Sequence, residues 1–126
     1  MKIFICEDDK DISELMQILI TDLGYEVEVF SEPETMLEML KRQKPGLLLL
    51  DYWLQDRSAK ETIHSIKSNP KLKDLPIILI SAVDNLDSLA ESLPVNGMIR
   101  KPFNIDDFQN QITSFVNAHA KKDSSH

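Results

Sequence analysis

The sequence predicts an α/β fold, in which five parallel strands form one sheet and helices cover both of its faces. Five short apolar runs recur along the chain, and most of them are continuous, as expected for strands buried on both faces. Between these runs lie segments whose apolar residues have helical spacing. Because strands and helices alternate with short connections, we expect a doubly wound parallel sheet with right-handed crossovers.

The size and composition of the chain fit one compact domain. It has 126 residues, of which 42% are hydrophobic, with only three Gly and six Pro. We expect the domain to span residues 1–119 and residues 120–126 to form a short polar tail. No run approaches the roughly 20 apolar residues that cross a bilayer, and acidic residues follow Cys6 before a signal-peptide core could form. A cytoplasmic location without membrane contact is therefore expected.

The five predicted strands follow one another along the chain as short apolar runs. They are Ile3–Cys6, Val27–Phe30, Leu47–Leu50, Ile77–Ile80 and Met98–Ile99. The single cysteine, Cys6, lies inside the first run, which favours a buried and unreactive thiol.

Five helices are expected between and after the strands. Their apolar positions are Ile12, Leu15, Met16, Leu19 and Leu23; Met36, Leu37 and Leu40; Ile63 and Ile66; Leu86, Leu89, Ala90 and Leu93; and Phe108, Ile112, Phe115 and Val116. Gly24 suits the end of the first helix, and Ser31 suits the cap of the second, with Pro33 near its start. Asn104 suits the start of the last helix. Pro94 predicts a short or irregular fourth helix.

The formal net charge of -7 argues against direct binding to nucleic acid. Affinity for a phosphate backbone comes from clustered Lys and Arg side chains, whose binding releases counterions. We therefore expect protein partners and no nucleic acid.

Acidic side chains follow the first and third predicted strands. Glu7, Asp8 and Asp9 come directly after the first strand, and Asp51 comes after the third. In a doubly wound sheet the first and third strands are neighbours, so their carboxyl ends bring these carboxylates together. Converging carboxylates raise each other's pKa values, which implies a compensating cation. Oxygen ligands of this kind suit Mg²⁺, which takes one or two carboxylates and leaves positions for phosphate oxygens.

A hydroxyl and an ammonium group follow the fourth and fifth predicted strands. Ser81 would bring a hydrogen-bond donor to the same edge, and Lys101 a fixed positive charge. Phosphoryl transfer needs mainly positioning and neutralisation of charge on the phosphoryl oxygens, which a metal, a Lys and a hydroxyl can supply. Asp51 is the best placed nucleophile, because carboxylates form acyl phosphates.

Taken in order along the chain, these motifs resemble the receiver domain of response regulators in two-component signalling, in particular the chemotaxis-receiver type. The resemblance rests on Glu7-Asp8, Asp51, Ser81-Ala82 and Lys101-Pro102-Phe103, and it covers essentially the whole chain. It implies a flavodoxin-like (βα)5 fold with strand order 2-1-3-4-5.

The resemblance also implies roles for individual residues. Asp51 would accept a phosphoryl group from the phosphohistidine of a histidine kinase or phosphotransfer protein. Mg²⁺ would be held by Asp8, Asp51 and the backbone carbonyl of Trp53, with Glu7 acting largely through metal-bound water. Ser81 would donate a hydrogen bond to a phosphoryl oxygen, and Lys101 would pair with the phosphate. The Lys101-Pro102 peptide bond would be cis. Such a domain is not an enzyme beyond self-phosphorylation and autodephosphorylation, and it switches a protein contact with an unknown downstream protein.

Three positions depart from the receiver pattern and keep a second function open. Gln55 and Ala59 stand where receivers usually have Pro and Gly, and Met98 replaces an aromatic residue. The alternative is a pseudo-receiver that binds partners independently of phosphorylation. Aspartate-nucleophile phosphatases are disfavoured, because they need a second Asp where this chain has Trp53. The Trp53 side chain is either an exposed loop aromatic or a shield for the acyl phosphate.

Overall fold

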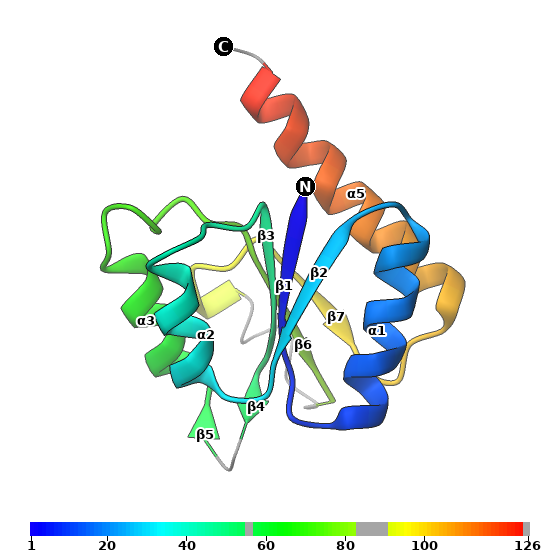
Figure 1. Cartoon of the computed structure of the whole chain (residues 1–126), viewed down its shortest axis with the longest axis horizontal. Coiled ribbons are helices and arrows are strands. Elements are labelled where there is room, and N and C mark those ends of the chain that lie inside the picture. The colour runs from blue at the N-terminus through cyan, green and yellow to red at the C-terminus, as the bar shows by residue number, and fades with distance from the viewer. Residues whose placement is uncertain (55–56, 83–90, 125–126) are drawn as a thin grey trace.

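The computed structural model describes residues 1–54, 57–82 and 91–124, and its centre is a five-stranded parallel sheet (Figure 1). The strand order is β2-β1-β3-β6-β7. The strands are β1 (Lys2–Cys6), β2 (Glu26–Phe30), β3 (Leu47–Asp51), β6 (Ile77–Ser81) and β7 (Gly97–Arg100). Because β6 and β7 are the fourth and fifth predicted strands, the order 2-1-3-4-5 is confirmed.

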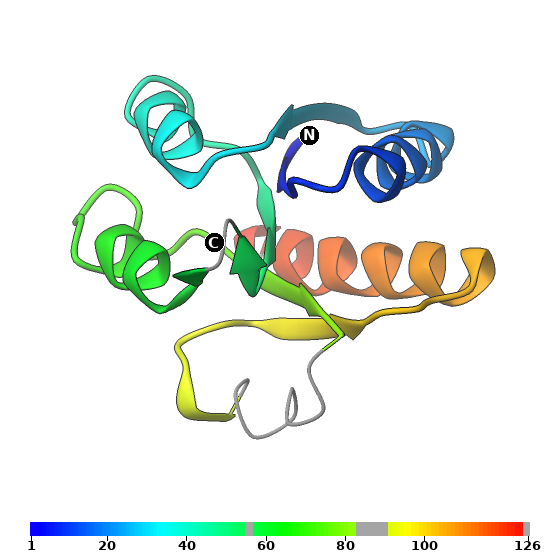
Figure 2. The same cartoon turned by 90° about the horizontal axis from the view of Figure 1, so that it is seen from below.

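Helices cover both faces of the sheet. Helices α1 (Lys10–Asp22) and α5 (Ile105–Ser124) lie on one face, and α2 (Pro33–Leu40) and α3 (Lys60–Lys67) lie on the other (Figures 1 and 2). Neighbouring side chains of each strand point to opposite faces. Each face therefore has its own apolar core, and the central strands β3 and β6 are buried along their whole length.

Of the three predicted helix-end residues, Gly24 and Asn104 are confirmed and Ser31 is not. Asp9 caps α1 by accepting a hydrogen bond from the Ile12 N–H at 3.1 Å. Asn104 likewise accepts from the Asp107 N–H at 2.7 Å at the start of α5. Gly24 follows α1 with a φ of 96°, a conformation that glycine adopts without steric cost. The predicted cap Ser31 is wrong: Glu32 occupies the cap position of α2 without a side-chain bond.

Pro33 explains why the second helix begins where it does. It stands in the first turn of α2, where the missing N–H costs nothing and the fixed φ suits a helix. Its place moves the cap one residue beyond Ser31.

A short hairpin after β3 was not predicted. Strands β4 (Trp53–Leu54) and β5 (Arg57–Ser58) pair antiparallel, with Trp53 opposite Ser58. The Arg57 guanidinium forms an ion pair with the Glu34 carboxylate of α2 at 2.5 Å. Two-residue strands are too short to leave a periodic signal in a sequence. Gln55 lies outside the described residues.

Leu86, Leu89 and Ala90, which belong to the predicted fourth helix, lie outside the described residues. Within the part of the chain that is described, no helix has the length and apolarity to cross a membrane.

Candidate functional site

Two acidic residues end up side by side because two neighbouring strands end at the same level. Cys6 pairs with Leu50, so the residues that follow them, Glu7 and Asp51, lie at the same edge of the sheet. The Glu7 N–H donates to the Phe30 carbonyl of β2 at 2.9 Å, which extends the pairing of β1 by one residue. Both carboxylates are almost fully buried, with 2% of Glu7 and 6% of Asp51 exposed. This edge is the lower one in Figure 1 and faces the viewer in Figure 2.

Three carboxylates form a cluster at this edge, as the sequence predicted. Oxygen atoms of Glu7, Asp8 and Asp51 all lie within 4.8 Å of one another, and Asp8 is the exposed member. Hard oxygen donors at this spacing fit a small divalent cation, and the exposed side leaves room for water and phosphate oxygens. The cluster could therefore hold a metal ion.

Lys101 reaches this cluster from the end of β7. Its Nζ lies 2.5 Å from Glu7 Oε1 and 3.2 Å from Asp51 Oδ2. The Lys101 N–H donates to the Ser81 carbonyl at 3.0 Å, which fixes the backbone from which the side chain extends. The Lys101-Pro102 bond is cis, as predicted. One ammonium group is thus shared between two buried carboxylates.

The electrostatics of the cluster follow from burial. Burial raises the pKa of Glu7 to about 7; the neighbouring Asp51 carboxyl adds to the rise, and Lys101 opposes it. Burial lowers the pKa of Lys101, but its bonds to Glu7 and Asp51 outweigh this and the net pKa is raised. Lys101 therefore stays a cation, while Glu7 can exchange a proton near neutral pH.

The Cys6 thiol, which precedes the cluster, is confirmed as a core group. It is fully buried, and burial together with the charge of Asp51 raises its pKa to about 12. The thiolate that would react as a nucleophile is therefore absent at neutral pH.

The backbone after Asp51 orients its carboxylate. The Trp53 N–H donates to Asp51 Oδ1 at 3.3 Å, while Lys101 donates to Oδ2. The Trp53 side chain is 51% exposed, and the centroids of the Trp53 and Tyr52 rings lie 6.5 Å apart. The ligand role of the Trp53 carbonyl and the shielding role of its side chain stay predictions.

Two other predicted residues lie at the same edge. Ser81 ends β6, is buried, and follows Ile80, the partner of Asp51 in the neighbouring strand. Asp9 caps α1, and its N–H donates to Glu7 Oε2 at 3.3 Å. Asp9 therefore serves as the cap residue of α1.

The direct bond from Lys101 to Glu7 was not predicted, since the sequence indicated only a counter-charge at the same rim. Met98 lies within β7, is half-buried, and packs against the core on the α2 and α3 face. Ala59, at the start of α3, is buried in the same core. Both departures from the receiver pattern therefore have packing roles.

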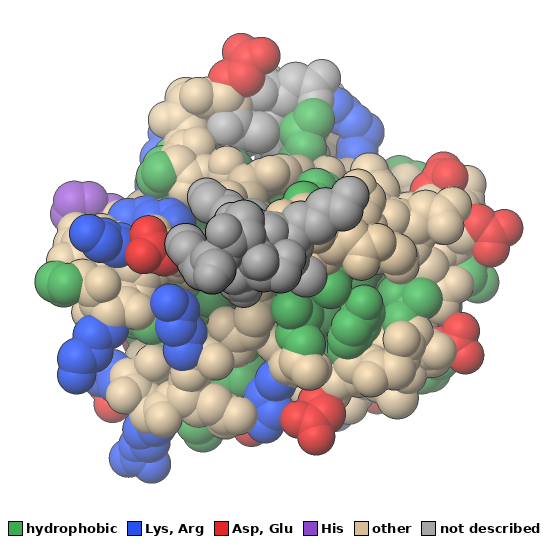
Figure 3. Space-filling model, turned by 90° about the horizontal axis from the view of Figure 1, so that it is seen from above, with side chains coloured by type: hydrophobic (Ala, Val, Ile, Leu, Met, Phe, Trp, Pro, Cys, Tyr) green, Lys and Arg blue, Asp and Glu red, His purple; other side chains and the backbone are tan. Residues whose placement is uncertain are grey.

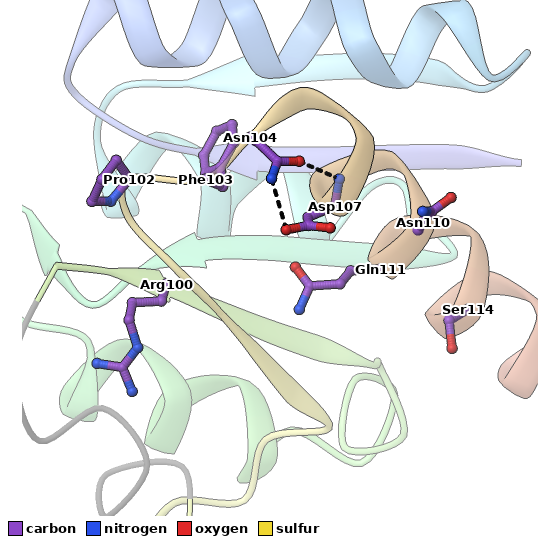
Figure 4. Close-up of a pocket in the computed structure, with 8 residues that line it drawn as sticks. All are labelled: Arg100, Pro102, Phe103, Asn104, Asp107, Asn110, Gln111 and Ser114. Carbon is purple, nitrogen blue, oxygen red and sulfur yellow. Dashed lines mark hydrogen bonds between the residues drawn. The ribbon is translucent and has the colours of Figure 1, made fainter.

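A polar pocket of about 490 Å³ lies beside β7 and the start of α5 (Figure 4). Asn104 and Asp107, two of its lining residues, bond to each other at 2.9 Å. None of the clustered carboxylates lines this pocket. The chemistry of the site thus lies in the acidic cluster and not in this cavity.

Comparison with known proteins identifies a family. Residues 3–113 match the family model described as response regulator receiver domain. The transcriptional regulatory protein CrdR of Helicobacter pylori is 33% identical over 118 residues, covering 92% of this chain and 55% of that protein. The chain spans about half the length of the first curated relatives it matches.

Solved structures share the fold. A crystal structure of the phosphorylated cyanobacterial phytochrome response regulator RcpA has a TM-score of 0.76 and 27% identity, covering 90% of this chain and 89% of that one. A crystal structure of the Mn²⁺-bound form of response regulator Rcp1 has a TM-score of 0.73 and 26% identity, covering 90% of this chain and 89% of that one. A curated relative from Synechocystis is also named response regulator Rcp1. These similarities agree with the predicted flavodoxin-like fold.

Proposed function

The chain belongs to the response regulator receiver domain family, and we propose that it accepts a phosphoryl group on Asp51 from the phosphohistidine of a histidine kinase or phosphotransfer protein. The observation that carries this proposal is the convergence of Glu7, Asp8 and Asp51 within 4.8 Å, with Lys101 bonded to two of them. A structural role alone does not require three carboxylates at one strand edge, because they repel one another.

The residues present fit Mg²⁺, which we propose as the cofactor. Asp8, Asp51 and the Trp53 carbonyl would hold it, and Glu7 would act through bound water. When bound, Mg²⁺ neutralises charge on the phosphoryl oxygens and aligns them for transfer. The Mn²⁺-bound form of the similar Rcp1 supports a divalent cation here.

In the proposed transfer, an Asp51 carboxylate oxygen attacks the phosphorus atom of the donor. A new O–P bond forms, the N–P bond of the phosphohistidine breaks, and the imidazole nitrogen keeps the electron pair and takes up a proton. The Trp53 N–H and Lys101 Nζ hold the carboxylate through different oxygen atoms, so its plane is fixed before the donor arrives. The phosphorylated state of the similar RcpA supports this chemistry.

Phosphorylation would then act as a switch. The product adds charge and acceptor oxygens at a buried edge, where the Ser81 hydroxyl and Lys101 can bind them. Because Lys101 would leave Glu7 and the Asp51 carboxylate to do so, the backbone at Ser81 and Lys101 would shift between two packings. The domain would turn over no external substrate beyond self-phosphorylation and autodephosphorylation, and its output would be a protein contact.

Trp53 provides a direct test, because it is the only tryptophan of the chain and lies next to the site. We expect beryllofluoride with Mg²⁺, a mimic of the phosphoryl group, to change Trp53 fluorescence in the wild type. The Asp51→Asn variant should show no such change. Identical fluorescence responses of the two proteins would refute the proposal and favour the pseudo-receiver alternative. The convergence of the three carboxylates does not support that alternative.

A further inference from the structure

A basic surface lies at the opposite edge of the sheet from the acidic cluster. We call it the basic edge: residues 41–46 after α2, and residues 67–75 at the end of α3 and after it. These segments hold six of the chain's 14 Lys and Arg residues but only one of its 21 Asp and Glu residues. The six are Lys41, Arg42, Lys44, Lys67, Lys71 and Lys73. Figure 3 views this edge, with basic side chains gathered mostly on the left half, over the ends of α2 and α3.

Most of these cations are available to a partner. Arg42, Lys44, Lys71 and Lys73 are exposed, and no ion pair involves them within the described part of the chain. Lys41 pairs with Glu38 at 3.1 Å, and both side chains are mostly exposed. In a chain of net charge -7, this concentration of positive charge makes a local field opposite in sign to that of the whole molecule.

Lys67 holds the second basic segment in a defined shape. Its Nζ donates to the Lys73 carbonyl at 2.9 Å and to the Leu75 carbonyl at 3.0 Å. The Lys71 N–H donates to Asn69 Oδ1 at 2.9 Å. Leu75 is fully buried and anchors the segment in the core. Lys71 and Lys73 are thus presented on a preorganised loop, which lowers the entropy cost of binding.

An apolar groove opens beside these cations. A cavity of about 310 Å³ lies between α2 and α3, and Leu37 and Leu72 supply its apolar wall. Lys41 and Asn69, from the two segments of the basic edge, also line it. The two carboxylates of the lining, Glu34 and Glu38, are paired within the protein by Arg57 and Lys41.

From this juxtaposition we propose that the basic edge binds an acidic amphipathic segment of a partner protein. An apolar side chain of the segment occupies the groove between α2 and α3, and its carboxylates meet Arg42, Lys71 and Lys73. This function goes beyond phosphoryl transfer, because the surface lies at the opposite edge of the sheet from Asp51 and does not use that residue.

Two other anionic partners fit less well. A nucleic acid would leave the apolar wall of the groove unused and would meet a chain of net charge -7. An anionic membrane would find a single exposed large apolar side chain here among the described residues, because Met1 lies against Gly46, whereas Leu15, Ile18, Trp53 and Ile105 lie away from both segments.

Fluorescence anisotropy with designed probes tests the proposal on the full chain. The first probe is a labelled helical peptide with Glu on one face and Leu on the other. Two matched peptides replace every Leu with Ser or every Glu with Lys. We expect the Glu/Leu peptide to bind with an affinity that falls as salt is added, and both matched peptides to bind at least roughly tenfold more weakly.

Charge reversal locates the binding surface. The double variant Lys71→Glu/Lys73→Glu should weaken binding of the Glu/Leu peptide roughly tenfold, and Ser65→Glu, which adds a carboxylate to the groove, should also weaken it. The control Lys10→Glu/Lys60→Glu changes net charge equally at the other edge and should bind like the wild type. The proposal is overturned if Lys71→Glu/Lys73→Glu binds as tightly as the wild type, or if the Glu/Leu peptide does not bind. It is equally overturned if duplex DNA or phosphatidylserine vesicles bind the wild type more tightly.

Discussion

At the scale of single residues, the site depends on one ammonium group shared by two buried carboxylates. The sequence predicted that Glu7, Asp8, Asp51 and Lys101 would meet, because each follows a strand of a parallel sheet. It could not predict that Lys101 would contact Glu7 at 2.5 Å, since that distance depends on the rotamers of two long side chains.

The first prediction concerns Mg²⁺ affinity. Lys101→Met keeps the length of the side chain but removes the positive charge that repels a divalent cation from the cluster. We expect Mg²⁺ to bind this variant roughly tenfold more tightly, as measured by titration calorimetry. Lys60→Met, a matched change at an exposed position away from the cluster, should leave the affinity unchanged. Weaker Mg²⁺ binding by Lys101→Met would mean that Lys101 supports the metal site instead of opposing it.

The second prediction concerns pH and the pKa of Glu7. In the folded state this pKa is raised from 4.5 to about 7, so the folded state binds more protons than the unfolded state between these values. The free energy of unfolding should therefore fall as pH rises from about 4.5 to about 7, by on the order of 2 kcal/mol from this group. Urea unfolding at a series of pH values, in the presence of a chelator, measures this free energy.

Glu7→Gln separates the contribution of Glu7 from those of other titrating groups. Across the same pH range, the free energy of unfolding of this variant should fall less than that of the wild type. If the free energy of unfolding falls equally in both proteins, the group that titrates across this pH range is not Glu7.

At the scale of elements, apolar periodicity was sufficient to predict the strands and the helices that lie within the described residues. The run Leu47–Leu50 became a fully buried strand, and the helical spacing from Ile12 became α1. Local chemistry was less reliable where two signals competed, as when Pro33 moved the cap of α2 away from Ser31. The hairpin of β4 and β5 left no signal, because its two-residue strands depend on tertiary contacts such as the pair of Arg57 with Glu34.

The close approach of β7 to α5 gives a prediction at this scale. A Cβ atom at Gly97 would lie 2.6 Å from the Phe115 ring, so Gly97→Ala forces the ring to move. We expect a loss of about 1–3 kcal/mol in the free energy of unfolding, measured by chemical denaturation. In the background of Phe115→Leu, which removes the ring, the same substitution should cost less. Equal costs in both backgrounds would exclude this steric explanation.

At the scale of the whole molecule, the two edges of the sheet carry opposite charge. The carboxyl ends of the strands hold the acidic cluster, and the amino ends hold the basic edge. The sequence predicted the first, because strand ends are identified by periodicity and the topology of a doubly wound sheet brings them together. It did not predict the second, although residues 41–46 and 67–75 precede the neighbouring strands β3 and β6, because charged residues in separate loops leave no periodic signal.

The central claim is that Asp51 accepts a phosphoryl group, and intact-mass measurement tests it most directly. Incubated with Mg²⁺ and either acetyl phosphate or phosphoramidate, the wild type should gain the mass of one phosphoryl group. Asp9→Asn, a carboxylate-to-amide change that keeps the cap of α1, should gain the same mass, and Asp51→Asn should gain none. The claim is contradicted if the wild type gains no mass from either donor, or if Asp51→Asn gains as much as the wild type.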